Sequence, residues 1–129
     1  MHVYIELQAT LPSRAITFYT TLFPTWSFQE DPSLPIPYYR GSLPSSPSIS
    51  INILQRAQDP PEPMQPTNAF VCSFPVNDEA AFEELEKKVL DMGGKIAMPR
   101  FQVPGRGVHG YFLDTEGNTF GVFTTTYTE

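Results

Sequence analysis

A short segment near the start of the chain carries side chains that could do acid–base chemistry. Tyr4, Glu6 and Gln8 recur at every second position, and a strand places alternate residues on one face. A carboxylate can accept a proton, and a neighbouring phenol can donate a hydrogen bond to an oxyanion. Glu6 is therefore a candidate base and Tyr4 a candidate donor. The alternative is that Glu6 is hydrogen-bonded and only holds the sheet together.

His109 is the second candidate acid or base, because imidazole side chains titrate near neutral pH. It follows a loop rich in Pro and Gly at 103–107. Either it acts at the rim of a site or it is an ordinary polar residue of a strand. The other histidine, His2, shares a face with Glu6, but four strand residues separate the two by about 13 Å, too far for one metal ion.

Length and charge narrow the class of partner. The 129 residues fit one domain with a hydrophobic core. The net charge of −6, with eight Lys and Arg in all, predicts neither nucleic acid nor an acidic membrane as a partner. No apolar run approaches the ~20 residues of a bilayer span, and the chain start lacks signal-peptide features. We expect a cytoplasmic protein, and a single cysteine, Cys72, agrees with a reducing compartment.

The first half of the chain predicts one strand, one helix and then further strands. Alternating apolar residues predict a strand over 3–9. Pro12 suits the first turn of a helix, Thr10 can cap it, and Pro24 ends it. Further strands are predicted at 26–29, 37–40 and 48–55, and the proline-rich segment 59–66 is interpreted as a linker.

The second half repeats this order. A strand over 69–75 is followed by a helix that Asp78 can cap and Gly93 can end. Strands are predicted at 95–99, 108–113 and 119–125, and the segment Asp114–Asn118 has the composition of a hairpin turn. Pro12 and Asp78 are 66 residues apart (78 − 12 = 66), about half of the 129 residues. The repeated order predicts two βαβββ modules.

Two segments carry a resemblance to a known family. YIELQATLPSRAITFYTTLFPTW and GGKIAMPRFQVPGRGVHGYFLDTEGNTFGVF resemble the vicinal oxygen chelate superfamily, in the branch related to lactoylglutathione lyase. The resemblance implies an α+β fold in which two βαβββ modules form a curled mixed sheet, a cup, with helices on its outer face. It covers nearly the whole chain, so we expect one domain over 1–129, with modules at about 1–58 and about 67–129.

The resemblance also implies four ligand positions for a divalent metal, in the first and last strand of each module. In this sequence they fall at Tyr4, at Phe70, within 52–54 and at Gly121. None of these residues offers an imidazole or a carboxylate, the ligands that catalytic zinc or iron requires. We therefore predict that the chain has lost the metal of the family and uses no cofactor.

Without a metal, the cup is expected to be an aromatic-lined pocket for a small organic molecule, with Glu6 inside it. The residues expected to bind this ligand are Gln8, Asn52, Phe70, Cys72, Tyr111, Phe123 and Trp26. Each aromatic residue has core packing as its alternative, and Cys72 has that of a small apolar strand residue.

Three functions remain open. The first is a metal-independent isomerase, lyase or cyclase with Glu6, His109 and Tyr4 as catalytic residues, which we favour because small-molecule chemistry is the commoner use of the superfamily. The second is a non-catalytic protein of the bleomycin-resistance type that sequesters a drug. The third is a structural or regulatory dimer with a vestigial cup. A homodimer is expected from the resemblance, and Ile49, Ile51 and Ile53 are expected to suit a sheet edge or an interface.

Overall fold

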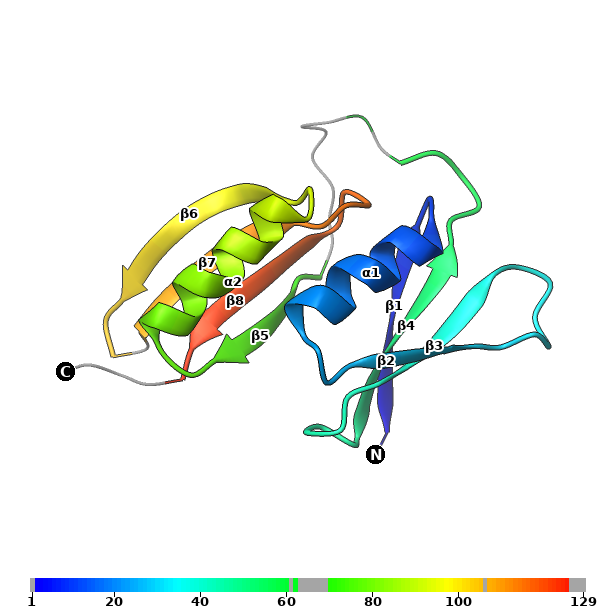
Figure 1. Cartoon of the computed structure of the whole chain (residues 1–129), viewed down its shortest axis with the longest axis horizontal. Coiled ribbons are helices and arrows are strands. Elements are labelled where there is room, and N and C mark those ends of the chain that lie inside the picture. Colours follow the sequence, from blue (N-terminus) through cyan, green and yellow to red (C-terminus); the bar gives the residue numbers. More distant parts are fainter. Residues whose placement is uncertain (1, 61, 63–69, 106, 126–129) are drawn as a thin grey trace. The chain divides into compact units, whose positions relative to one another are not determined.

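A computed structural model describes residues 2–60, 62, 70–105 and 107–125. The chain divides into two compact units, Met1–Glu62 and Pro63–Glu129, and each is described here by itself. Each unit is one βαβββ module with a four-stranded mixed sheet and one helix (Figure 1). The predicted α+β class and its two modules are confirmed. Most of the predicted linker lies outside the described residues.

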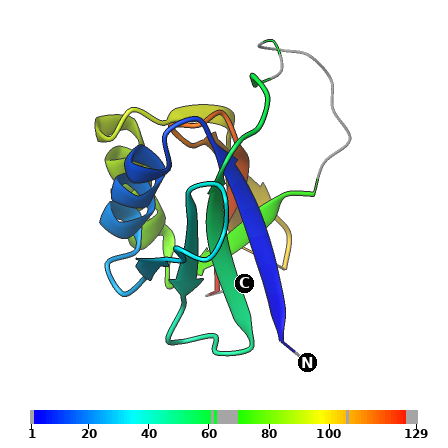
Figure 2. The same cartoon turned by 90° about the vertical axis from the view of Figure 1, so that its right-hand side faces the viewer.

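The first module has a parallel pair of strands at one side of its sheet. The strand order is β1-β4-β3-β2, with β1 and β4 parallel and the other neighbours antiparallel. Figure 2 shows α1 to one side of β1 and β4. The elements are β1 Val3–Ala9, α1 Pro12–Leu22, β2 Ser27–Glu30, β3 Tyr38–Ser42 and β4 Ile49–Gln55.

Alternation along β4 decides what the helix covers. Ile51 and Ile53 are buried on the helix side, together with Phe18 and Tyr19 of α1. Burying each such side chain contributes roughly 1.5–3 kcal/mol, which stabilises the module. The expectation of a sheet edge or an interface at Ile49, Ile51 and Ile53 is wrong for Ile51 and Ile53, because β4 is a central strand and its apolar face is already covered.

The start of α1 follows from Pro12, which stands at the first turn where its missing N–H costs nothing. The N-cap residue is Leu11, and no side chain caps it. Thr10 therefore does not serve as the cap that the sequence suggested. The helix is held by its apolar stripe against the sheet, since tertiary packing stabilises most protein helices.

The second module repeats the arrangement with strand order β5-β8-β7-β6. Strand β6 runs further than predicted and includes Pro99, which is tolerated because β6 is an edge strand with irregular pairing between Met98 and Phe101. The elements are β5 Cys72–Val76, α2 Glu79–Asp91, β6 Lys95–Val103, β7 Gly107–Leu113 and β8 Thr119–Thr124.

Local signals set the ends of α2 and the last turn as predicted. The Asp78 carboxylate accepts a hydrogen bond of 2.8 Å from the N–H of Ala81, and Gly93 takes a φ of 92° just after the helix. In the β7–β8 turn, Asp114 Oδ1 accepts the N–H groups of Glu116 and Asn118, each at 2.8 Å. These bonds make β7 and β8 a hairpin.

Among the described residues, no helix is long and apolar enough to cross a membrane.

Candidate functional site

The face of the first sheet turned away from α1 carries two of the three predicted catalytic residues, Glu6 and Tyr4. Tyr4, Glu6 and Gln8 project from this face and are exposed, because Ile5, Leu7 and Ala9 alternate with them toward the helix. On the neighbouring strand β4, Asn52 pairs directly with Glu6. The structure therefore brings together Glu6, Tyr4 and Asn52, of which the sequence had predicted Glu6 and Tyr4 on one face.

A hydrogen-bond chain connects three side chains on this face. The Tyr38 hydroxyl donates to Glu6 Oε2 at 2.6 Å, and it accepts a bond of 3.0 Å from Asn52 Nδ2. Asn52 Oδ1 in turn accepts the backbone N–H of Gly41 at 3.1 Å. Asn52 is 2% exposed, so its amide is fixed on both sides. The chain aims one carboxylate oxygen of Glu6 at Tyr38, and within the described residues no hydrogen bond to the other oxygen, Oε1, occurs.

Gly41 allows β3 to approach β4 closely enough for this chain. A Cβ at this position would overlap the carbonyl oxygen of Ile51 and crowd the ring of Phe28. Glycine is therefore required by the close approach and not by its backbone angles. The Gly41 N–H then lies within reach of Asn52 Oδ1.

Burial of the phenol favours its neutral, donating form. Tyr38 is 7% exposed. Desolvation by this burial raises the pKa of Tyr38 above 10.0, and the hydrogen bond to Glu6 raises it further. A phenol that stays protonated remains a hydrogen-bond donor to a carboxylate at physiological pH.

An open cavity of about 430 Å³ adjoins Glu6. Its wall combines two phenols, one carboxylate, one guanidinium and several apolar side chains. The lining residues are Tyr4, Glu6, Leu34, Pro35, Ile36, Tyr38, Arg40 and Leu54. Such a mixture of apolar wall and few polar groups is typical of small-molecule sites. We refer to it as the Glu6 cavity.

Arg40 lines the Glu6 cavity, and contacts with Asp31 and Tyr38 hold its side chain in place. Its Nε donates to Asp31 Oδ2 at 2.8 Å, and its guanidinium carbon lies 5.7 Å from the centre of the Tyr38 ring. Asp31 also accepts bonds from the N–H and the hydroxyl of Ser33. These bonds from Ser33, and then that from Arg40, hold the pKa of Asp31 below its usual 3.8. The sequence reasoning missed Arg40, although its spacing from Tyr38 on one strand indicated a shared face.

Three predicted site residues of the second module, His109, Tyr111 and Phe123, lie on one face of its sheet. His109 lies between Phe101 and Phe123, with ring centres at 6.0 and 5.7 Å, and Tyr111 lies 6.4 Å from Phe101. His109 pairs with Phe123 in the β7–β8 register, so both project from the same side. These residues form an aromatic row.

Gly121 lies beside this aromatic row, at the position where the family resemblance implies a metal ligand. A Cβ there would overlap Ser73 Oγ and press on the Tyr111 ring at 3.0 Å. Ser73 is the register partner of Gly121 on β5. The space that a ligand side chain would need is thus taken by these two neighbours.

Three residues expected at the ligand lie elsewhere. Trp26 is 9% exposed and packs against Phe23 and Tyr19, with ring centres 4.3 and 5.9 Å away, on the helix side. Cys72 pairs with the buried Phe120, and burial raises the pKa of its thiol. Both follow the core alternatives named above.

Phe70 is the third of these residues. It precedes β5 and is fully exposed.

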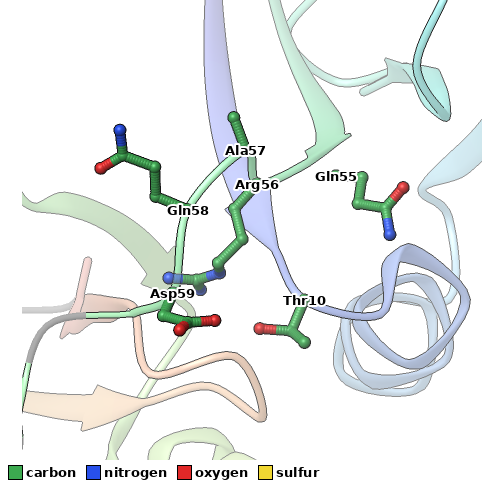
Figure 3. A pocket seen from close by; sticks show the side chains of 6 residues that line it. All are labelled: Thr10, Gln55, Arg56, Ala57, Gln58 and Asp59. Carbon is green, nitrogen blue, oxygen red and sulfur yellow. The ribbon is translucent and has the colours of Figure 1, made fainter.

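A second cavity of about 430 Å³ lies at the ends of β1 and β4 (Figure 3). Its lining is polar and contains none of the predicted site residues. The residues are Thr10, Gln55, Arg56, Ala57, Gln58 and Asp59. The Arg56 guanidinium donates to the backbone oxygen of Gln8 at 3.2 Å. We place the site at the Glu6 cavity, because that cavity combines a carboxylate and phenols with apolar walls.

The residues at the family's metal positions do not fit a divalent ion. Asn52 already bonds Tyr38 and Gly41, Tyr4 offers a phenol, and Gly121 has no side chain. Within the part of the chain that the structure describes, no three His, Cys, Asp or Glu side chains group closely enough to hold a metal.

Known structures place the fold. No protein-family model matches the sequence, and no curated protein matches it either. A glyoxalase/bleomycin resistance protein/dioxygenase family enzyme from Burkholderia phytofirmans PsJN superposes with a TM-score of 0.72 at 16% identity, over 95% of this chain and 97% of the other. A glyoxylase/bleomycin resistance protein/dioxygenase domain from Frankia sp. EAN1pec has the same score and identity, over 99% and 92%.

A variant of the fosfomycin resistance protein FosX from Listeria monocytogenes, complexed with Mn(II) and a dihydroxypropylphosphonic acid, has a TM-score of 0.72 at 15% identity, over 98% of this chain and 91% of that chain. At these identities the likeness concerns the fold. The chain shares the fold of these glyoxalase/bleomycin resistance protein/dioxygenase structures, which the sequence resemblance predicted.

Proposed function

We propose that this protein is a metal-independent isomerase or lyase that removes a proton from the carbon next to a carbonyl group of a small organic molecule. Glu6 is the base. The observation that carries the proposal is the Glu6 carboxylate at an open, partly apolar cavity, with Oε2 bonded to Tyr38 and no hydrogen bond to Oε1 among the described residues. A base held in one orientation loses little freedom on reaction.

The proposed step forms an enolate by transfer of one proton to Glu6. Glu6 Oε1 accepts the proton as the C–H bond breaks, and that electron pair forms a carbon–carbon double bond. The carbonyl π electrons move to oxygen, where the Tyr4 hydroxyl of the same wall donates a hydrogen bond to the enolate. Glu6 then returns the proton to the opposite face of the same carbon as the enolate electrons return from oxygen, which inverts that carbon. Alternatively, the enolate electrons expel a leaving group from the carbon beyond, and the leaving group takes the proton from Glu6.

Tyr38 and Asn52 have a positioning role in this scheme. Tyr38 contacts the base and not the reacting carbon, and Asn52 fixes Tyr38. Because the pKa of Tyr38 is raised by burial, the phenol keeps donating to Glu6 while the base works. General acid–base catalysis of this kind contributes typically about 10²–10⁴-fold in rate.

The experiment follows exchange of carbon-bound hydrogen for deuterium in D₂O by proton NMR, with 4-phenyl-2-butanone and 2-oxo-4-phenylbutanoate as probes. We expect catalysed exchange next to the carbonyl that Glu6→Gln lowers at least about 100-fold. Glu30→Gln is the matched control, because Glu30 is an exposed strand residue outside the cavity. Exchange that survives Glu6→Gln but is lost in His109→Gln would move the base to the second module.

A non-catalytic binding protein is the second candidate function. The apolar side chains Tyr4, Leu34 and Ile36 are 58%, 39% and 43% exposed at the cavity, which favours adsorption of an apolar ligand. This function predicts binding of the same probes without exchange, weakened by Tyr4→Ala and unaffected by Glu6→Gln. The homodimer stays a prediction, to be tested by sedimentation equilibrium.

A further inference from the structure

We propose that the Glu6 cavity binds a carboxylate through Arg40, so that its substrates are small 2-oxo or 3-oxo acids with an apolar tail. The oxo group rests on the proposed function, whereas carboxylate binding by Arg40 stands without it. Three features support the inference: the anchored geometry of Arg40, the separation of charges in the cavity, and its apolar wall.

Asp31 anchors the Arg40 side chain at its inner nitrogen, Nε. Its side chain is 63% exposed, and that of Asp31 is 15% exposed. Asp31 accepts from Nε alone, and Asp31 is itself fixed by two bonds from Ser33. The terminal Nη1 and Nη2 donors of Arg40 have no hydrogen-bond partner among the described residues. A guanidinium whose inner nitrogen is anchored presents its outer fork in a geometry that matches a carboxylate.

The charges of the cavity are separated along one wall. Of the described residues that line it, Arg40 is the one cation and Glu6 the one anion. Tyr38 stands between them, because its hydroxyl bonds Glu6 while its ring lies 5.7 Å from the Arg40 guanidinium carbon. Tyr38 and Arg40 are two residues apart on β3, so they leave the strand about 7 Å from each other on the same face.

This separation orients a ligand. A carboxylate is attracted to Arg40 and repelled by Glu6, so it binds at the Arg40 end. The carbons one or two bonds from that carboxylate then lie toward the base. The carbon with acidic C–H protons beside the ketone is two bonds from the carboxylate in a 2-oxo acid and one bond from it in a 3-oxo acid. Leu34 and Ile36 line the same cavity and suit an apolar tail.

The first test measures binding of 3-phenylpropanoate and of 3-phenylpropanamide to the full chain by amide NMR titration. The two probes differ in charge and hardly in shape. We expect the acid to bind about tenfold more tightly, the low end of what a charge-assisted hydrogen bond contributes. Arg40→Gln should abolish this preference, while Arg40→Lys, which keeps the charge and loses the fork, should retain part of it.

Arg56→Gln is the matched control, because Arg56 lines the other cavity. Equal affinity of acid and amide for the native chain overturns the inference, and so does binding of neither up to about 10 mM. Loss of the preference in Arg56→Gln but not in Arg40→Gln overturns it as well. Should Arg40→Gln fail to fold, the acid and amide affinities of the native chain and of Arg40→Lys still decide.

The exchange assay separates this inference from the proposed function. Arg40-dependent preference for the acid without any deuterium exchange keeps the carboxylate site and removes the catalytic role of Glu6. Exchange that is as fast for 4-phenyl-2-butanone as for 2-oxo-4-phenylbutanoate, in native chain and Arg40→Gln alike, keeps the catalytic role and removes the substrate class.

Discussion

Tyr38→Phe removes a single hydroxyl from the centre of the site. That hydroxyl donates to Glu6 at 2.6 Å and accepts from Asn52 at 3.0 Å. The ring of phenylalanine fills the same space, so the change leaves packing intact. We expect a folded but less stable protein with a less well oriented base.

The loss of stability follows from the two partners. Glu6 is exposed, so water replaces the lost donor and this bond costs little, about 0.5–1 kcal/mol. Asn52 is 2% exposed, and its Nδ2 loses a buried partner, which costs about 1–3 kcal/mol. Together we expect the free energy of unfolding to fall by about 1.5–4 kcal/mol.

The stability difference between the native protein and Tyr38→Phe should depend on pH. The pKa of Tyr38 in the folded protein is raised above 10.0, by burial first and by Glu6 second. Its contribution to stability is therefore fully present below pH 10 and is lost as pH rises through the folded-state pKa. Native protein should lose stability in this alkaline range, and the difference from Tyr38→Phe should shrink there.

The assay is urea unfolding followed by Trp26 fluorescence, at pH 7 and at steps above pH 10. Tyr39→Phe is the matched control, because Tyr39 is the next residue of β3 and lies on its opposite face. We expect Tyr39→Phe to change the free energy of unfolding by less than about 0.5 kcal/mol. A cost for Tyr38→Phe no larger than for Tyr39→Phe would refute the hydrogen-bond chain as a stabilising feature.

Three further predictions concern single positions. Gly41→Ala should lower the free energy of unfolding by about 3 kcal/mol or more, because its Cβ overlaps the Ile51 carbonyl, whereas Gly105→Ala, with φ +73° and open space, should cost about 1–2 kcal/mol in the same urea assay. Cys72 should react with DTNB more slowly than a free thiol at pH 8, and faster as pH rises above 9.0, since burial raises its pKa. Elemental mass spectrometry of Gly121→Glu purified with zinc should find less than about a tenth of an equivalent of zinc per chain. Near-stoichiometric zinc would contradict the conclusion that the residues at these positions do not fit a metal.

Much of the fold could be predicted from the sequence because its signals are local. The cap at Asp78, the stop at Gly93 and the Asp114 turn each act within a few residues, and all three appear as expected. Alternation in 3–9 also assigned Glu6 and Tyr4 to one face of a strand. The strand boundary at β6 was predicted too short, because proline in an edge strand cannot be recognised before the edge is known.

For strands with apolar residues on both faces, the sequence could not predict which face packs against the helix. In β5, Cys72 and Phe74 alternate with Ser73, but nothing local says which face meets α2. The contact of Phe74 with the buried Phe120 shows that the face with Cys72 and Phe74 belongs to the core. Trp26 could equally line a pocket or pack on the helix, and stacking with Phe23 decided for the helix side.

By itself the sequence determined the order and type of the elements, and the face on which Glu6 lies, since these depend on residue spacing and on turn chemistry. Only the tertiary structure decided which side chains Glu6 contacts there. Its partner Tyr38 is 32 residues away and Asn52 is 14 residues from Tyr38. That meeting depends on the register of β1 with β4 and on the close approach of β3 at Gly41, and hydrogen bonds between distant strands leave no local trace in the sequence.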